Sequence, residues 1–394
     1  MNSSTLKNKT ILLGVTGGIA AYKSAELIRK LKKEGASVRV VMTEAATRFI
    51  PPLTLTSLSG EEVYTDMFSS PMAHIELPRE ADLFLIAPVT ANTLSRLASG
   101  AADDMVSACF LAFKGPVLLA PAMNWRMYEH PATQKNLKTL KEMGCTEIPP
   151  DKGELACGEH GSGRMADLEI ILEEVRIALS KKDLSGKRVV VTAGPTREQI
   201  DPVRFISNRS SGKMGYALAR VARRRGAEVV LISGPTSLNP PHSVEFVQVE
   251  SAEQMYKAVL DNLKGADLLV MAAAVADFRV KAPSSVKRKK TSLRSLELLP
   301  TVDILERIAA LKRRPFVIGF SAETGPNIAT ANRKLKDKKM DMVVFNDVSQ
   351  KDAGFESDTN RIVIIARGLE KEYPLMSKEA CAEVIFDHYL EFES

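Results

Sequence analysis

The chain has 394 residues, of which 45% are hydrophobic and only 6% aromatic, and its formal net charge is +6 at pH 7. This length predicts two to three domains with sizeable cores, and the scarcity of aromatic residues argues against a platform that stacks nucleic-acid bases. Four cysteines without close pairing make no disulfide framework, and the lack of a CxxC motif argues against structural zinc. No apolar run approaches the roughly 18 residues that span a bilayer. We therefore expect a cytoplasmic protein with neither a membrane nor a nucleic-acid partner.

In the first half of the chain, short apolar runs alternate with helical patterns. The expected strands are residues 10–15, 37–42, 82–87 and 116–120, and the expected helices are residues 19–33, 91–98 and 133–143. This alternation is typical of a parallel sheet that is covered by helices on both faces. Such sheets bind ligands at the carboxyl ends of their strands.

A polar stretch at residues 181–187 follows a helix expected near residues 170–180, and the domain boundary is placed there, giving domains 1–184 and 185–394. The pattern then restarts, with strands at 188–192, 228–232, 267–271, 316–319 and 342–345 and a helix at 211–225. The sequence thus predicts two doubly wound α/β domains. Residues 279–299 are basic and irregular, and we interpret them as a flap or hairpin over a ligand. The alternative is a disordered surface loop.

The glycine turn after the first strand, Gly17 and Gly18 followed by Ile19, suits an anion because backbone N–H groups and a helix N-terminus meet there. It is not a GxGxxG motif. Glu44, just after the second strand, fills the ribose-binding role only loosely, so NAD is disfavoured without being excluded. Thr43 and the turn at residues 90–93 place neutral donors at strand ends, which suits a mononucleotide phosphate and a flavin edge. The alternative for any one of them is a helix N-cap.

Three further residues form a candidate catalytic set. Cys157 lies in a glycine-dense loop, a position suited to proton delivery rather than to packing, while His74 and Asn124 lie upstream in compact motifs. The alternative for His74 is a structural partnership with Glu76. Cys109 and Cys145 are interpreted as packing residues.

In the second half, residues 210–212 and Lys213 precede a helix and form a phosphate-cradle pattern that lacks the Walker A spacing. Small residues at 272–276 end a strand and leave room for a flat base. Asp277 follows them, where it is suited to a base, a sugar or a metal; the alternative is a turn residue.

The motifs TGGIAAYK, AHIEL, APVTANT, PAMNWRM and GELACGEHGSGRM, together with the second-half motifs, resemble those of the bifunctional coenzyme A biosynthesis family, phosphopantothenoylcysteine decarboxylase fused to phosphopantothenate–cysteine ligase. The resemblance implies a flavodoxin-like domain in which FMN oxidises the cysteinyl thiol, so that CO₂ can leave, and then reduces the resulting ene-thiol. His74 would handle protons, Asn124 would hold the substrate carboxylate, and Cys157 would protonate the ene-thiol. The implied FMN-binding residues are Gly17, Gly18, Ile19, Thr43, Thr90, Ala91, Asn92, Thr93 and Ala122.

For the second half, the resemblance implies a Rossmann-like ligase domain in which CTP, with Mg²⁺, activates phosphopantothenate as an acyl-cytidylate that cysteine then attacks. Asn208 would act in the conversion of that intermediate, and Lys287 would bind the nucleotide phosphates from the flap. The other implied CTP-binding residues are Ala273, Asp277, Val302, Asp303, Ile304, Leu305, Phe320, Lys334 and Lys338. Val302 departs from the usual Pro-Asp-Ile turn, and Arg288 departs from an expected apolar residue in the flap.

The combined expectation is an enzyme that takes 4′-phosphopantothenate, L-cysteine and CTP to 4′-phosphopantetheine. The resemblance further implies a homo-oligomer built from decarboxylase trimers and ligase dimers. Two alternatives remain open: a flavin decarboxylase whose second half is only a regulatory nucleotide-binding module, and a nucleic-acid-binding protein that uses the basic clusters at residues 223–225 and 287–290.

Overall fold

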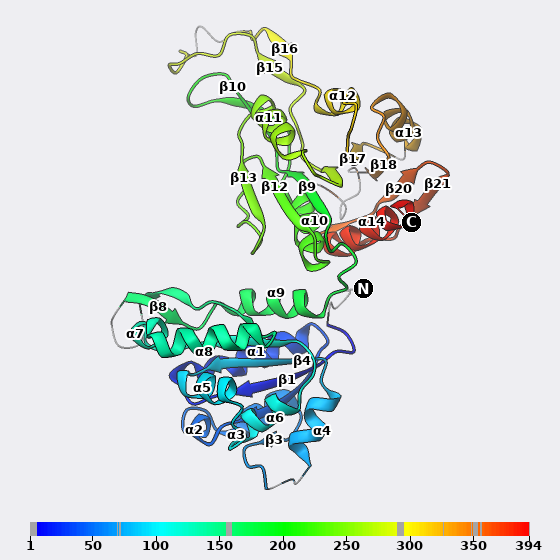
Figure 1. Ribbon diagram of the computed structural model, residues 1–394. Helices are drawn as coiled ribbons and strands as arrows, with labels where there is room; N and C mark the ends of the chain where they lie inside the picture. Colours follow the sequence, from blue (N-terminus) through cyan, green and yellow to red (C-terminus); the bar gives the residue numbers. More distant parts are fainter. Residues whose placement is uncertain are drawn as a thin grey trace. The chain divides into compact units, whose positions relative to one another are not determined.

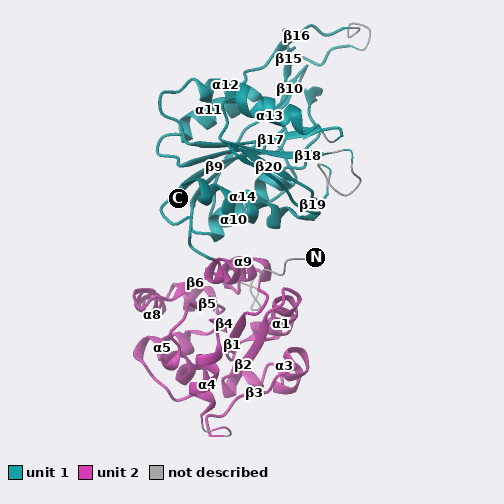
Figure 2. Cartoon of the chain, turned by 90° about the vertical axis from the view of Figure 1, so that its right-hand side faces the viewer, with its two compact units in different colours: residues 1–3, 181–394 teal, residues 4–180 magenta. Residues whose placement is uncertain are grey.

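The computed structural model describes residues 6–68, 70, 72–154, 160–289, 295–325, 327–347, 349, 354 and 357–393. The chain divides into two compact units and passes from one to the other between Ser180 and Lys181 (Figure 2). Within the described residues, no helix is both long enough and apolar enough to cross a bilayer.

The first unit is built on a parallel sheet with strand order β3-β2-β1-β4-β5-β6. Its strands are β1 (Thr10–Val15), β2 (Ser37–Met42), β3 (Val63–Tyr64), β4 (Leu83–Val89), β5 (Val117–Pro121) and β6 (Thr146–Glu147). Its helical segments are η1 (Ile19–Tyr22), α1 (Lys23–Lys33), α2 (Glu44–Thr47), α3 (Pro52–Ser59), α4 (Ala73–Glu80), α5 (Ala91–Ser99), α6 (Met105–Ala112), α7 (Trp125–Glu129), α8 (Pro131–Glu142) and α9 (Leu168–Leu179). A hairpin of β7 (Asp151–Glu154) and β8 (His160–Arg164) precedes α9.

Alternation along the strands divides the core of the first unit between the two faces of the sheet. Leu13 packs on the face covered by α1, α3 and α9, whereas Leu12 packs on the face covered by α4, α5, α6 and α8. The order of strands reverses at β1, which lies between β2 and β4. A ligand site is therefore expected at the carboxyl ends of β1 and β4.

The second unit contains an eight-stranded sheet of order β13-β12-β9-β14-β17-β18-β20-β21, parallel from β13 to β18 and antiparallel beyond. Its strands are β9 (Arg188–Ala193), β12 (Glu228–Ser233), β13 (Glu245–Gln248), β14 (Leu268–Met271), β17 (Phe316–Glu323), β18 (Met342–Asp347), β20 (Val363–Ala366) and β21 (Leu369–Glu372). The helices are α10 (Lys213–Arg224), α11 (Ala252–Asn262), α12 (Ile304–Ala309), α13 (Ile328–Asp337) and α14 (Lys378–Glu393). Short pairs join β10 (Arg197–Gln199) to β11 (Phe205–Ser207), β15 (Phe278–Val280) to β16 (Leu298–Pro300), and β19 (Thr359–Asn360) to β22 (Met376–Ser377).

The prediction of two doubly wound α/β units is thus confirmed. The observed helices and strands differ from the predicted ones in where they begin and end. The helix expected at residues 19–33 opens as the 3₁₀ turn η1, and the strand expected at 82–87 runs on to Val89. The helix expected to begin at residue 211 begins at Lys213, because Gly212 adopts a left-handed φ of 78° at the N-cap.

The basic segment at residues 279–299 is a hairpin at its base, where β15 pairs with β16 (Figure 1). It is fastened to the neighbouring β10–β11 hairpin by Asp201, a buried carboxylate that accepts bonds from the side chain of Arg204 and from the backbone N–H of Arg288 at 3.1 Å. Bonding to Arg204 holds the pKa of Asp201 well below its usual range. Residues 290–294 lie outside the described part of the chain.

Candidate active sites

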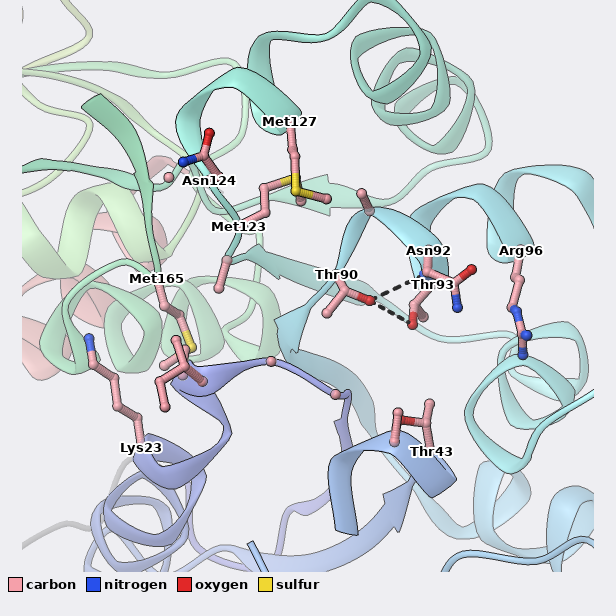
Figure 3. A pocket seen from close by; sticks show the side chains of 18 of the residues that line it. Lys23, Thr43, Thr90, Asn92, Thr93, Arg96, Met123, Asn124, Met127 and Met165 are labelled. Atoms are coloured by element: carbon pink, nitrogen blue, oxygen red, sulfur yellow. Dashed lines mark hydrogen bonds between the residues drawn. The ribbon is translucent and has the colours of Figure 1, made fainter. Parts of the chain in front are cut away.

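A pocket of about 1020 Å³ opens at the carboxyl edge of the first sheet, as its topology predicts (Figure 3). The sequence-predicted cofactor residues all line it: Gly17, Gly18, Ile19, Thr43, Thr90, Ala91, Asn92, Thr93 and Ala122. They come from the ends of β1, β2, β4 and β5, so four separate segments of the chain build one cavity.

Close packing fixes the glycine turn at the floor of this pocket. A Cβ at Gly17 would lie 2.5 Å from the Cβ of Ala45, so only glycine fits. The buried hydroxyl of Thr16 donates to the carbonyl of Pro88 at 2.9 Å and accepts from the N–H of Thr90 at 3.1 Å. The turn after β1 is therefore held against the turn after β4.

The threonines of the pocket divide into two kinds. Thr90 is the N-cap of α5, where its hydroxyl accepts from the N–H of Thr93, and the two hydroxyls are 3.2 Å apart, so the capping interpretation holds for Thr90 (Figure 3). Thr43 is the N-cap residue of α2 but makes no capping bond, and its buried Oγ1 has no hydrogen-bond partner among the described residues. Burying an unpaired hydroxyl costs free energy. Helix capping therefore does not account for Thr43.

The opposite wall is formed by residues 122–127 and strand β8. The N–H of Met123 donates to the carbonyl of Gly163 at 2.9 Å, and a Cβ at Gly163 would lie only 2.2 Å from the Met123 carbonyl oxygen. Asn124 lines the pocket beside them and caps α7 by accepting from the N–H of Arg126 at 2.9 Å. The β7–β8 hairpin that carries the predicted Cys157 is thus joined to the Asn124 wall, while Cys157 itself lies outside the described residues.

His74 is not among the residues that line this pocket. It lies on α4, half-buried, and its Nδ1 has no hydrogen-bond partner among the described residues, so the alternative partnership with Glu76 is not formed at that atom. Cys109 and Cys145 are buried, which confirms them as packing residues. Burial raises the pKa of Cys109 to about 12 and that of Cys145 to about 11.

Sequence reasoning missed several residues of the first pocket, among them Lys23, Arg96, Arg164 and Met165. Burial, and then the charge of Arg164, lower the pKa of Lys23. Lys23 ends the TGGIAAYK motif, so its place in that motif was an available signal.

The second unit has its own pocket, of about 1140 Å³, along the carboxyl edge of β14, β17 and β18. Predicted ligase residues that line it are Asn208, Ala273, Asp277, Val302, Asp303, Ile304, Leu305, Phe320, Lys334 and Lys338. Lys287 lies on the flap and is not among the lining residues.

Two lysines of α13 reach this pocket, and each is held by an acid. Lys334 donates to Glu323 at 2.7 Å and to the hydroxyl of Ser321 at 3.2 Å. Lys338 donates to Asp303 at 2.6 Å. The bond from Lys334 lowers the pKa of Glu323. Burial alone would raise the pKa of Asp303, but the bond and charge of Lys338, together with the backbone N–H groups of Glu306 and Leu305, outweigh burial and lower it.

Asn208 is positioned from across the pocket, because its Nδ2 donates to the carbonyl of Val275 at 2.8 Å. The strand-end run of small residues is in turn held by Thr196, whose hydroxyl accepts from the N–H of Ala276 at 2.8 Å. The lining also includes Asn346, Asn360 and Lys378, which sequence reasoning missed because no motif surrounds them.

Comparison with known proteins agrees with this division. Residues 1–180 match the family described as "Flavoprotein", and residues 184–392 match "DNA/pantothenate metabolism flavoprotein C-terminal domain". Fold, pockets and matches thus define a two-unit protein of the flavoprotein class, whose second unit is the C-terminal domain of pantothenate-metabolism flavoproteins. The chain is 46% identical over 383 residues to "Coenzyme A biosynthesis bifunctional protein CoaBC" of Bacillus subtilis (strain 168), covering 95% of this chain and 94% of that protein.

The protein of the same name from Escherichia coli (strain K12) is 44% identical over 393 residues, 97% of each chain. A crystal structure of the C-terminal domain of a CoaBC protein aligns with 42% identity and a TM-score of 0.47, covering 54% of this chain and 99% of that one. The chain belongs to the coenzyme A biosynthesis bifunctional protein family, a family of enzymes with small-molecule substrates.

Proposed function

We propose that this chain joins 4′-phosphopantothenate to L-cysteine with CTP, through an acyl-cytidylate, and then decarboxylates the product to 4′-phosphopantetheine with FMN. The observation that carries the proposal is the pair of pockets, one in each unit, each at the carboxyl edge of a parallel sheet and each lined by the motifs that match the bifunctional family. A chain whose second half served only regulation would not need a positioned Asn208.

The first pocket fits FMN in its chemistry. Gly17, Gly18 and Ile19 offer a backbone cradle for a phosphate, and the unpaired hydroxyl of Thr43 is a hydrogen-bonding group that a flavin would satisfy. When bound, FMN supplies the two-electron oxidation and reduction at the substrate thiol. The chain would supply the rest: Asn124 would orient the substrate carboxylate by hydrogen bonding, and Cys157 would donate a proton.

His74 requires a different explanation, because it does not line the pocket of its own unit. Its sequence neighbours Met72 and Ile75 are 55% and 41% exposed, which makes an exposed apolar surface beside it. In the trimer that the resemblance implies, a second copy would cover this surface, and His74 would serve a site that two copies complete. The ligase half would pair as a dimer. The cytoplasmic location stays part of the proposal, and the free thiols of Cys109, Cys145 and Cys381 accord with it.

The second pocket suits a triphosphate, because Lys334 and Lys338 offer fixed cations. Among the described residues, no three His, Cys, Asp or Glu side chains gather into a metal site. Mg²⁺ is commonly held by one or two carboxylates together with substrate phosphates, and Asp277 would be the carboxylate here. Lys287 would approach the phosphates from the flap.

Two assays on the purified chain test the two halves separately. Continuous release of pyrophosphate should require cysteine and phosphopantothenate together, because cysteine must clear the acyl-cytidylate before the next turnover. Without cysteine, mass detection across a panel of nucleoside triphosphates should find the acyl-cytidylate. No cysteine-dependent product would end the ligase proposal. For the other half, the protein should carry FMN. A colourless protein that cannot be reconstituted would end the decarboxylase proposal.

Cys157→Ser tests the assigned proton donor. Because only the late protonation should be lost, this variant should still release CO₂ but stall before 4′-phosphopantetheine, which mass spectrometry would detect as an accumulated ene-thiol. Cys145→Ala is the matched control, since Cys145 is buried outside the pocket. Full turnover by Cys157→Ser would show that another group is the acid.

A further inference from the structure

The second pocket has a basic end that is separate from Lys334 and Lys338. It lies at the start of α10, a helix of 12 residues, and is lined by residues 208–215. The N–H groups of a helix's first turn have no partner within the helix, and the helix dipole there favours an anion. Lys213 stands at this helix start, where Asp358 binds it at 2.6 Å.

Lys378 reaches the same end of the pocket from α14, far away in the sequence. It is 6% exposed, and its Nζ donates to the carbonyl of Ser357 and, at 3.5 Å, to that of Gly354. A lysine carries three donors, so at least one N–H remains. Within the described residues Lys378 forms no ion pair, and the charge of Asp358 offsets the cost of burying this lysine only in part. Burial, and then the charge of Lys213, lower the pKa of Lys378 to about 8.

Asn360 adds an independent indication of a ligand. It is 4% exposed and lines the pocket, yet its Oδ1 has no hydrogen-bond partner among the described residues. Burying an unsatisfied amide group is unfavourable unless something else satisfies it. Because the oxygen and nitrogen of such an amide interchange by a flip, Asn360 can present its NH₂ group as a donor.

We propose that Lys378 and Asn360, with Lys213 and the start of α10, form a binding site for the phosphoryl group of a substrate. All these groups are donors or cations, which is the complement of a phosphate dianion. The inference rests on the proposed function, in which two phosphorylated molecules must share one pocket. Each of them would then have its own basic end, one at Lys334 and Lys338 and the other here.

Binding and kinetics on the full chain identify which substrate this end serves. For Lys378→Met and Asn360→Leu, we expect the Kd and KM of one phosphorylated substrate to rise by about 10- to 100-fold, the usual size of a lost charged hydrogen bond. If the Kd and KM for phosphopantothenate rise while those for CTP stay unchanged, the site binds the 4′-phosphate of phosphopantothenate. If only the Kd and KM for CTP rise, the site binds the phosphates of the nucleotide. Lys257→Met, an exposed lysine of α11, is the control.

Asn360→Asp separates a binding role from a structural one. The substitution conserves shape and places a carboxylate in the region of Lys378, so a purely structural role predicts unchanged or higher thermal stability and unchanged affinity. A phosphoryl site predicts the same effect on stability but a large loss of affinity, because the new carboxylate repels the phosphate. Folded variants whose Kd values for both CTP and phosphopantothenate stay within twofold of the parent would overturn the proposal. Calorimetry gives these values even if the chain makes no ligase product, so failure of the site and failure of the proposed function are distinguishable.

Discussion

The two pockets of this chain occupy the same place in their sheets but differ in how they hold charge. The residues predicted to hold the cofactor in the first are neutral, namely glycine backbone, threonine hydroxyls and amides, although Lys23, Arg96 and Arg164 also line that pocket. In the second, Lys334, Lys338 and Lys213 are each bound to an acid. A neutral, closely packed cradle suits a cofactor that stays bound, whereas exchangeable ion pairs suit charged substrates that enter and leave at each turnover. If this contrast is correct, steric changes should damage the first pocket most and charge changes the second.

The largest effect is expected from Gly163→Ala. The added methyl group would meet the Met123 carbonyl oxygen at 2.2 Å, so the wall that carries Asn124 must move. We expect FMN content and decarboxylation to fall by about a hundredfold or more, because small displacements in a preorganised site are costly. Cysteine-dependent pyrophosphate release should be unchanged.

Gly153→Ala is the matched control in the same β7–β8 hairpin, because a Cβ at Gly153 would meet nothing within 4 Å. It should retain FMN and decarboxylation. Equal damage from both substitutions would show that the hairpin is sensitive to any change and that the contact with Met123 is not the cause.

Lys338→Met should affect the second pocket through charge, with a moderate effect. It removes a cation and leaves the partly buried Asp303 carboxylate without its partner. We expect the KM for CTP to rise about 10- to 100-fold, measured by pyrophosphate release, while the flavin spectrum stays the same. Lys336→Met on the same helix is the control, since Lys336 is exposed and outside the pocket. Equal KM values for the two variants would contradict an electrostatic role.

The comparison also explains what the sequence could predict. Glycines and small polar residues directly after apolar runs indicated the carboxyl edge of each sheet, and Thr43, Asn124 and Asn208 indeed line pockets there. The sequence could not separate Thr43 from Thr90, because both begin helices and only the folded chain shows that one hydroxyl caps its helix and the other does not. The local sequence pattern therefore predicts the topology of the sheets, but not which side chains form hydrogen bonds.

Residues brought in from distant segments were the harder ones. Lys378 and Asn360 follow the parallel part of the sheet and reach the pocket only because β19 and β22 pair in front of α14. No motif surrounds them, so the sequence alone does not distinguish them from polar residues on the surface. His74 is the opposite case: its motif is distinctive, but its place in the fold does not bring it to the pocket of its own unit, and its role stays a prediction.

The smallest effect is expected from Thr43→Val, for which stability and FMN affinity should change in opposite directions. The Thr43 hydroxyl is buried without a partner among the described residues, so replacing it with a methyl group should raise the free energy of unfolding of the flavin-free protein by about 1 kcal/mol. FMN affinity should nevertheless fall, because the ligand loses its bond to that hydroxyl. Thr16→Val is the control: its hydroxyl makes two hydrogen bonds, so both stability and affinity should decrease. Thermal unfolding with and without FMN measures both quantities. Loss of stability in flavin-free Thr43→Val would mean that the hydroxyl already has a hydrogen-bond partner, and that a ligand is not needed to satisfy this atom.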